Sequence, residues 1–94
     1  MKKQKPKPAT IGQRIRELRQ ARGRKIHAQL AQRVPAVALK PPEDQYTQAD
    51  LARDCGCRQD QICLWERGVK IPSLGSLAKL ARVLEASLDE LVGE

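Results

Sequence analysis

The amino-acid sequence predicts an all-α fold, a compact domain of five helices. Its 94 residues include one Trp, one Tyr and no Phe. The core must therefore be built from Leu, Ile, Val and Ala, which points towards packed helices rather than a sheet. Apolar residues also recur at spacings of three and four, and no segment shows the alternation typical of a strand. This length suits one small domain, so we expect a domain at residues 10–94 behind a tail at residues 1–9.

Positive charge is concentrated at the N-terminal end. The chain carries 18 basic and 11 acidic residues, a net charge of +7, which makes a polyanion the first partner to consider. Residues 1–25 hold ten of the basic residues and one acid. Residues 1–9 contain two prolines and no apolar periodicity, which predicts a disordered basic arm. The cations of this arm are Lys2, Lys3, Lys5 and Lys7. Such an arm either lies along nucleic-acid phosphates or is a solvated tail.

The first helix is expected at about 10–22. Thr10 and Gln13 fit a capping box, in which the Thr oxygen and the Gln side chain pair with free backbone amides at the start of a helix. The apolar stripe that follows consists of Ile11, Ile15 and Leu18. Gly23 comes next, and glycine is the residue type that most often ends a helix.

Residues 24–45 have a weaker pattern. Apolar residues recur at Ile26, Leu30 and Val34, which predicts a separate short helix that ends before the proline at position 35. Two prolines and two acids then make residues 40–44 an extended, exposed loop. The lone histidine of the chain, His27, is expected to be exposed and without a function.

The next two helices are short. Thr47 begins the first of them, with Asp50 three residues later, and Gly56 breaks it after two turns. The second spans about 59–67 and stops at Gly68. Two short helices joined by a tight glycine turn are the components of a helix-turn-helix unit.

The residue types of this segment suit such a unit. Ala52 is small where the two helices would cross, and Gly56 can adopt the positive φ that the turn needs. Apolar residues stand at the positions that would lock the helices together, namely Leu51, Cys55, Cys57, Ile62 and Trp65. Trp65 is expected to pack between helices rather than to stack on a base.

Two more helices complete the predicted fold. Pro72 and Ser73 open the fourth helix, whose apolar stripe consists of Leu74, Leu77, Leu80, Ala81 and Leu84. Ser87 and Glu90 form a capping box at the start of the last helix. The apolar residues of that helix are Leu88, Leu91 and Val92.

In combination, these segments resemble the lambda-repressor-like (Cro/CI, or XRE-type) helix-turn-helix family. The matching pieces are Ile11-Gly-Gln-Arg-Ile-Arg-Glu-Leu-Arg19, Tyr46-Thr-Gln-Ala-Asp-Leu-Ala52, Ile62-Cys-Leu-Trp-Glu-Arg-Gly68, Pro72-Ser-Leu, Leu77-Ala-Lys-Leu-Ala81 and Leu88-Asp-Glu-Leu91. They cover about 10–23 and 46–92. The chain departs from the family in an insertion of some 22 residues at 24–45. Three roles are open to the insertion: to lengthen the first helix, to reach towards DNA, or to form a surface for a partner.

The resemblance implies a five-helix DNA-binding domain whose third helix enters the major groove. The residues implied to face base edges or the groove rim are Arg58, Gln59, Gln61 and Leu64. Gln48 is implied to bond a phosphate, and Lys70 to hold the DNA backbone. Arg19 and Glu66 match a structural ion pair typical of the family. Asp60 is a departure, because it would repel phosphates unless it accepts a hydrogen bond from cytosine N4.

The implied function is that of a sequence-specific DNA-binding transcriptional regulator, a repressor that acts by occupying promoter DNA. One helix reads few base pairs, so we expect a homodimer on double-stranded DNA, formed through the last helix, the insertion or cooperative assembly. The alternative is an antitoxin-type module that neutralises a protein partner through residues 24–45 and regulates its own promoter. Nonspecific nucleoid binding is a third hypothesis, which predicts a steep salt dependence without sequence preference.

Composition disfavours several other classes of protein. No run of about 18 apolar residues occurs, so no membrane-spanning segment is expected. Neither a secretory signal nor a disulfide framework is indicated, which favours a cytoplasmic, nucleoid-associated location. The cysteines at 55, 57 and 63 lack a nearby fourth ligand, so no metal or cofactor is expected, and only Cys63 should be exposed. No catalytic arrangement is present, so an enzyme is not expected.

Overall fold

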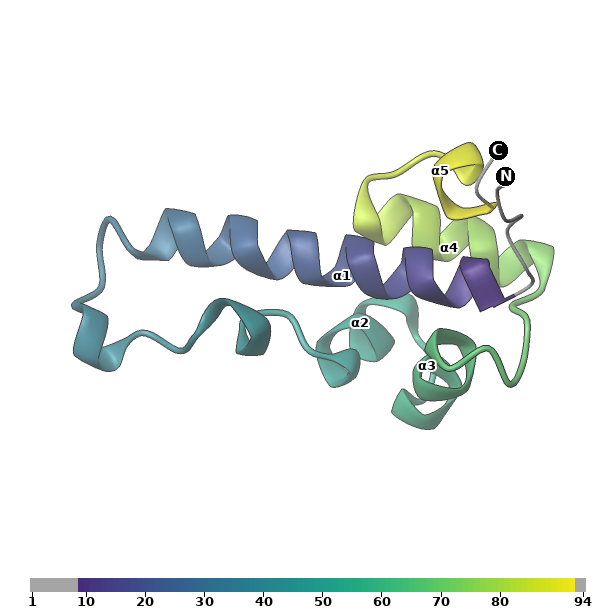
Figure 1. The fold of residues 1–94 in the computed structure, drawn as a ribbon, viewed down its shortest axis with the longest axis horizontal. Coiled ribbons are helices and arrows are strands. Elements are labelled where there is room, and N and C mark those ends of the chain that lie inside the picture. Colours follow the sequence, from purple (N-terminus) through teal and green to yellow (C-terminus); the bar gives the residue numbers. More distant parts are fainter. Residues whose placement is uncertain (1–8, 93–94) are drawn as a thin grey trace, which may run out of the picture.

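The computed structural model describes residues 9–92, and this part of the chain is all-α, as the sequence predicts (Figure 1). The elements are α1 (Ala9–Leu30), the 3-10 helices η1 (Ala36–Ala38) and η2 (Pro42–Asp44), α2 (Gln48–Cys55), α3 (Gln59–Glu66), α4 (Leu74–Leu84) and α5 (Leu88–Val92). In Figure 1, α4 and α5 lie above α1, and α2 and α3 lie below it. The long first helix is therefore the support for both pairs.

The first helix is longer than the sequence predicts. It runs unbroken through Gly23 to Leu30, so the expected end at Gly23 and the separate helix at 26–34 are both wrong. Thr10 lies inside the helix, which begins at Ala9, rather than ahead of it as a cap. Gly23 is buried, and a Cβ there would lie 2.9 Å from the Pro42 carbonyl oxygen. This glycine allows a close approach of the returning chain, instead of ending the helix.

Residues 24–45 form a hairpin, in which the end of α1 goes out and the chain returns beside it (Figure 1). The stretch expected to be extended at 40–44 contains η2, and the Gln45 side-chain amide donates a 2.9 Å hydrogen bond to the Lys40 carbonyl oxygen. Tyr46 closes the base of the hairpin. Its buried ring lies 5.0 Å from the Arg22 guanidinium, and its hydroxyl donates a 2.6 Å hydrogen bond to Asp54.

The caps and the turn of the helix-turn-helix unit form as predicted. The Thr47 hydroxyl accepts from the Asp50 amide, while the Asp50 carboxylate accepts from the Thr47 amide at 2.9 Å. Gly56 follows α2 with φ of +72°, a left-handed conformation that favours glycine. Ser87 and Glu90 exchange the equivalent pair of hydrogen bonds at the start of α5.

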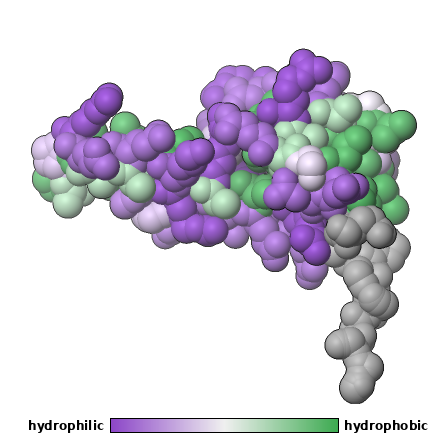
Figure 2. Space-filling view, turned by 90° about the horizontal axis from the view of Figure 1, so that it is seen from above, coloured by the Kyte–Doolittle hydropathy of each residue, from purple (hydrophilic) through white to green (hydrophobic). Residues whose placement is uncertain are grey.

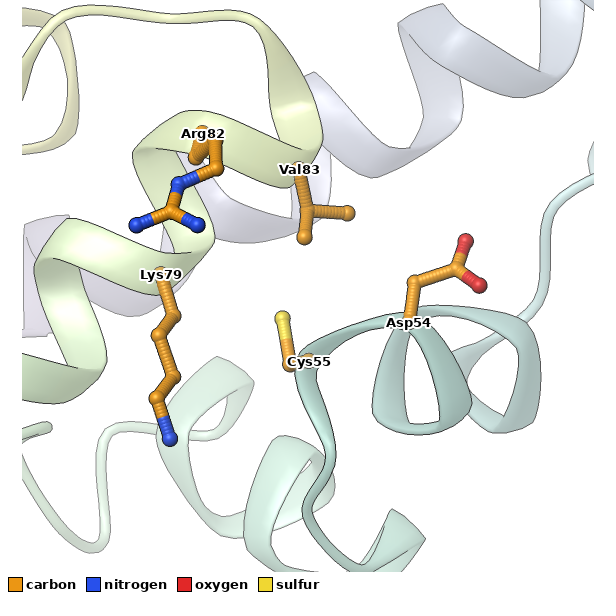
Figure 3. Close-up of a pocket in the computed structure, with 5 residues that line it drawn as sticks. All are labelled: Asp54, Cys55, Lys79, Arg82 and Val83. Carbon is orange, nitrogen blue, oxygen red and sulfur yellow. The ribbon is translucent and has the colours of Figure 1, made fainter.

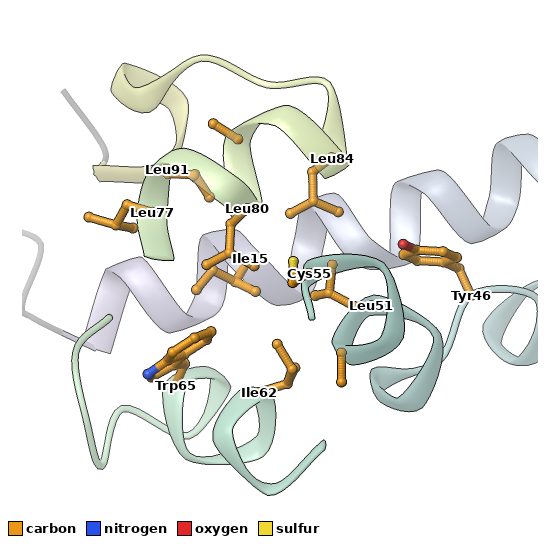
Figure 4. Packing of buried hydrophobic residues seen from close by; sticks show 12 residues of the cluster. Ile15, Tyr46, Leu51, Cys55, Ile62, Trp65, Leu77, Leu80, Leu84 and Leu91 are labelled. Atoms are coloured by element: carbon orange, nitrogen blue, oxygen red, sulfur yellow. The ribbon is translucent and has the colours of Figure 1, made fainter. Parts of the chain in front are cut away.

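The core lies where the five helices meet (Figure 4). One fully buried residue comes from each helix: Ile15, Leu51, Ile62, Leu80 and Leu91. Trp65 is 6% exposed and packs in this cluster, as expected. Because each helix contributes one of these residues, the position of α3 is fixed by the whole core.

Two leucines and the histidine differ from the expected exposure. Leu74, assigned to the apolar stripe of α4, is 74% exposed, because the buried stripe of that helix begins one turn later at Leu77. Leu88 is exposed at the start of α5. His27 is half-buried rather than exposed, because it lies on α1 inside the hairpin and not on a free loop.

Candidate nucleic-acid interface

The N-terminal part of α3 presents the residues that the sequence assigns to base recognition. Gln59 is exposed at the first position of the helix, and Gln61 and Leu64 are half-buried further along it. The opposite side of α3 is buried through Ile62 and Trp65. The helix is thus held on one side by the core, while a polar side remains accessible.

Arg58 and Asp60 form an exposed ion pair at the start of α3. The Arg58 guanidinium donates to both carboxylate oxygens of Asp60, at 2.9 and 3.2 Å. Hydrogen bonding to Arg58 keeps the pKa of the Asp60 carboxyl below its usual value. The negative charge of Asp60, which was expected to repel phosphates, is therefore paired with the neighbouring cation of Arg58, a contact that the residue types alone do not reveal.

Glu66 is the centre of a buried polar network between three helices. Its carboxylate accepts from Arg19 Nε at 2.7 Å and from Arg19 Nη2 at 3.1 Å, so the expected ion pair joins α1 to α3. The Gln48 side-chain amide donates to Glu66 at 3.0 Å and adds the start of α2. Arg16 Nε lies 3.5 Å from the same carboxylate. The network fixes how α2 and α3 sit relative to α1.

Gln48 has a second role in this arrangement besides the one that the resemblance implies. Its amide group carries two N–H donors, and Glu66 takes up one of them. The second remains available at the first residue of α2. The contact between Gln48 and a DNA phosphate stays a prediction. Because Glu66 orients the amide group, the phosphate would have to lie where the second N–H points.

Gly12 lies at the contact between α1 and α3, a role that the sequence did not predict for it. A Cβ at this position would lie 2.1 Å from the Trp65 carbonyl oxygen and 2.8 Å from that of Glu66. The backbones of α1 and α3 therefore touch at Gly12. A glycine within the first helical pattern was the available signal, because glycine is unfavourable inside a helix unless packing requires it.

The loop after α3 and the first residue of α4 carry exposed apolar side chains that the sequence does not predict to be exposed together. We call Val69, Ile71 and Leu74 the loop patch; their exposed fractions are 58%, 57% and 74%. Figure 2 shows hydrophobic residues gathered at the end of the molecule opposite the hairpin. Lys70, expected to hold the DNA backbone, is exposed within the same loop.

Cys55 and Cys57 lie near the junction of α2 and α4, and Cys63 lies on α3. Cys55 is buried and both Cys57 and Cys63 are half-buried, so the expectation that Cys63 alone would be exposed is wrong. A hollow of about 280 Å³ lies beside Cys55, lined also by Asp54, Lys79, Arg82 and Val83 (Figure 3). Burial raises the pKa of the Cys55 thiol to about 11 and also raises that of Cys57. Both thiols therefore stay protonated at neutral pH, which makes them poor nucleophiles.

Within residues 9–92, no three His, Cys, Asp or Glu side chains are grouped as a metal site requires. No helix in this range is long and apolar enough to cross a membrane. Residues 1–8 of the predicted basic arm, with Lys2, Lys3, Lys5 and Lys7, lie outside the described residues, whereas Ala9 begins α1 instead of belonging to the arm.

Comparison with known proteins agrees with the geometry. A helix-turn-helix family model matches residues 43–91, which is 49 of the 94 residues and includes α2, α3, α4 and most of α5. No curated protein and no solved structure matches the chain. The matched range holds the capped α2, the left-handed turn at Gly56 and the accessible side of α3. The chain therefore belongs to the lambda-repressor-like (Cro/CI, or XRE-type) helix-turn-helix family of DNA-binding regulators.

Proposed function

We propose that the protein is a transcriptional repressor that binds operator DNA as a homodimer and reads it with α3 in the major groove. The observation that carries this proposal is the two-sided character of α3. Its buried side is fixed by the core and by the Glu66 network, while Gln59 stands exposed at its first position. A rigid helix with accessible polar side chains at its N-terminal end is the geometry by which such units contact base edges. Occupation of promoter DNA is then sufficient for repression.

Each accessible residue has a matching chemistry on the DNA. A Gln side chain can bond adenine N6 and N7 at once, and Leu64 can contact a thymine methyl group. Arg58 and Asp60 together present donors and acceptors at the groove rim. Lys70 in the following loop and the free amide N–H of Gln48 are suited to phosphates on either side of the groove.

Gln59→Ala is expected to weaken binding to the cognate site by about 1–3 kcal/mol and to relax the preference at one base pair. The reason is the loss of a bidentate contact, with no change in the core. The measurement is a set of affinities for the preferred site and for its single-base variants. Gln29→Ala, an exposed glutamine on α1, is the control and should bind as wild type does. Equal weakening on every sequence would show that Gln59 does not read a base.

The loop patch is the surface that best suits the dimer. Val69, Ile71 and Leu74 are large apolar side chains, each more than half exposed, next to the helix that would enter the groove. Neighbouring apolar side chains that are exposed to solvent are typical of a surface that binds another protein. A two-fold axis through this patch would bring two copies of α3 to the same side of a DNA duplex, as a pair of half-sites requires.

Leu74→Glu is expected to reduce affinity for two adjacent half-sites by at least about tenfold, which corresponds to about 1.4 kcal/mol. Binding to a single half-site should fall by much less, because the added charge opposes DNA phosphates in both cases but is buried only in the dimer. Val37→Glu makes the same change at another exposed apolar residue, on η1, and serves as the matched control on duplexes that end at the edge of the half-sites. A similar loss with both variants, or none with Leu74→Glu, would place the dimer contact elsewhere.

A further inference from the structure

The family match includes only the last three residues of the hairpin, 43–45. The match begins at residue 43, whereas α1 continues past Gly23 to Leu30 and the chain returns through η1. Seven residues beyond Gly23 extend the helix by about 10 Å. In Figure 1 the hairpin projects away from the other helices on the side that leads into α2. It therefore adds a surface next to the helix-turn-helix unit.

The hairpin is basic, and its cations have no acidic partner. No acid occurs between Glu17 and Glu43, and the basic residues of the hairpin before that acid are Arg24, Lys25, Arg33 and Lys40. All four are exposed, and the ion pairs within the described residues involve none of them. The arginines earlier in α1 differ. Arg16 and Arg19 lie 3.5 and 2.7 Å from Glu66, and Arg22 lies 3.8 Å from Glu85.

The unpaired cations of the hairpin do not all lie on the same side of α1. Arg24 lines a hollow of about 320 Å³ with Gln20, Pro42 and Glu43, on the side of the chain that returns to α2. Its neighbour Lys25 lines hollows with Glu85, on the side of α4. Arg16, Gln20 and Arg24 follow one another along α1 at intervals of about one turn, and Arg16 reaches the Glu66 network at the start of α2. That end of α2 is where the proposed function puts a DNA phosphate.

We propose that Arg24, Arg33 and Lys40 form a contact to the phosphate backbone of the DNA that flanks each half-site. This inference rests on the proposed function and deepens it, because the hairpin would add affinity outside the groove without reading sequence. Unpaired, exposed cations on a hairpin that leads into the helix-turn-helix unit match a polyanion in charge. Glu43 and Asp44 stand at the base of the hairpin and oppose the contact, so Glu43→Gln should strengthen binding.

The test compares two triple variants that lose the same net charge. The first is Arg24→Gln with Arg33→Gln and Lys40→Gln. The control is Lys25→Gln with Lys79→Gln and Arg82→Gln, three exposed cations on the side of α4. Affinity is measured against salt concentration on two duplexes with the same selected site. One duplex ends at the edge of the half-sites, and the other extends about one helical turn beyond them. Thermal melting of each variant establishes that it is folded.

Log K falls with log salt, and each lost phosphate contact should make this dependence less steep by about 0.9. On the longer duplex, the slope of the first triple variant should therefore be about two to three units shallower than that of wild type. On the shorter duplex it should have the same slope as wild type, and the control should match wild type on both. Equal shifts in the two triple variants would overturn the proposal in favour of a net-charge effect. No shift in the first variant would also overturn it, and would direct attention to a protein partner for the exposed Val37. A wild-type protein that selects no DNA site would overturn the proposed function itself, before any variant is compared.

Discussion

Gly12→Ala should lower the free energy of unfolding by about 3 kcal/mol, at the upper end of the usual cost of overpacking. The new Cβ would lie 2.1 Å from the carbonyl oxygen of Trp65 and 2.8 Å from that of Glu66. Both atoms belong to the backbone, so no side chain can rotate away. α1 and α3 must separate, and the core between them must repack. Urea denaturation measures the change directly.

Gly75→Ala is the matched control for this prediction. Gly75 is an exposed residue of α4, and a Cβ there would meet only the Ser73 hydroxyl, at 4.0 Å. Removing a glycine from a helix without a clash should raise stability by about 0.5–1 kcal/mol. The two substitutions are therefore expected to act in opposite directions. If Gly12→Ala also stabilises the protein, α1 and α3 do not touch as described.

Glu66→Gln should cost about 3–5 kcal/mol of folding stability, the range expected when a buried ion pair loses one partner. The Arg19 guanidinium would remain charged and nearly buried, with a side chain only 10% exposed. A single amide oxygen would have to accept the hydrogen bonds that two carboxylate oxygens now share between Arg19 and Gln48. The loss should appear as a lower urea midpoint with an unchanged slope.

Two comparisons make the Glu66 prediction specific. Asp60→Asn breaks the exposed pair with Arg58 and should leave stability nearly unchanged, because solvent screens that pair. Arg19→Met combined with Glu66→Leu removes both buried charges and should recover much of the loss, since apolar replacement of a whole buried pair is often neutral. A Glu66→Gln protein as stable as Asp60→Asn would contradict the buried network.

The elements of the helix-turn-helix unit could be predicted because their signals are local. Thr47 with Asp50, and Ser87 with Glu90, lie three residues apart and cap their helices by direct hydrogen bonds. Gly56 is required by the left-handed turn that it occupies. Local rules gave the wrong end for α1, because Gly23 serves a contact with residues 42 and 46, some twenty positions away. No local pattern distinguishes a glycine that ends a helix from one that admits a neighbour.

In the candidate site, too, some features could be predicted from the sequence and others depend on how distant residues pack. The resemblance to the family supplied the residue types of α3, yet the pairing of Arg58 with Asp60 depends on side-chain conformations that sequence does not give. The loop patch was missed for a different reason. An apolar residue at helical spacing is usually assigned to the core, and Leu74 stands three residues before the buried Leu77. Only the packing of α4 on the other helices shows which of the two is covered.

Selection of bound duplexes from a random pool, with the wild-type protein at near-physiological salt, tests whether a dimer reads DNA through α3. A repressor that reads DNA with α3 as a dimer should enrich a motif of two inverted half-sites, centred about one helical turn apart. Preference within each half-site should be strongest at the base pairs that Gln59 and Gln61 reach. Binding that persists only at low salt and enriches no sequence would contradict the account, because affinity would then come from charge alone.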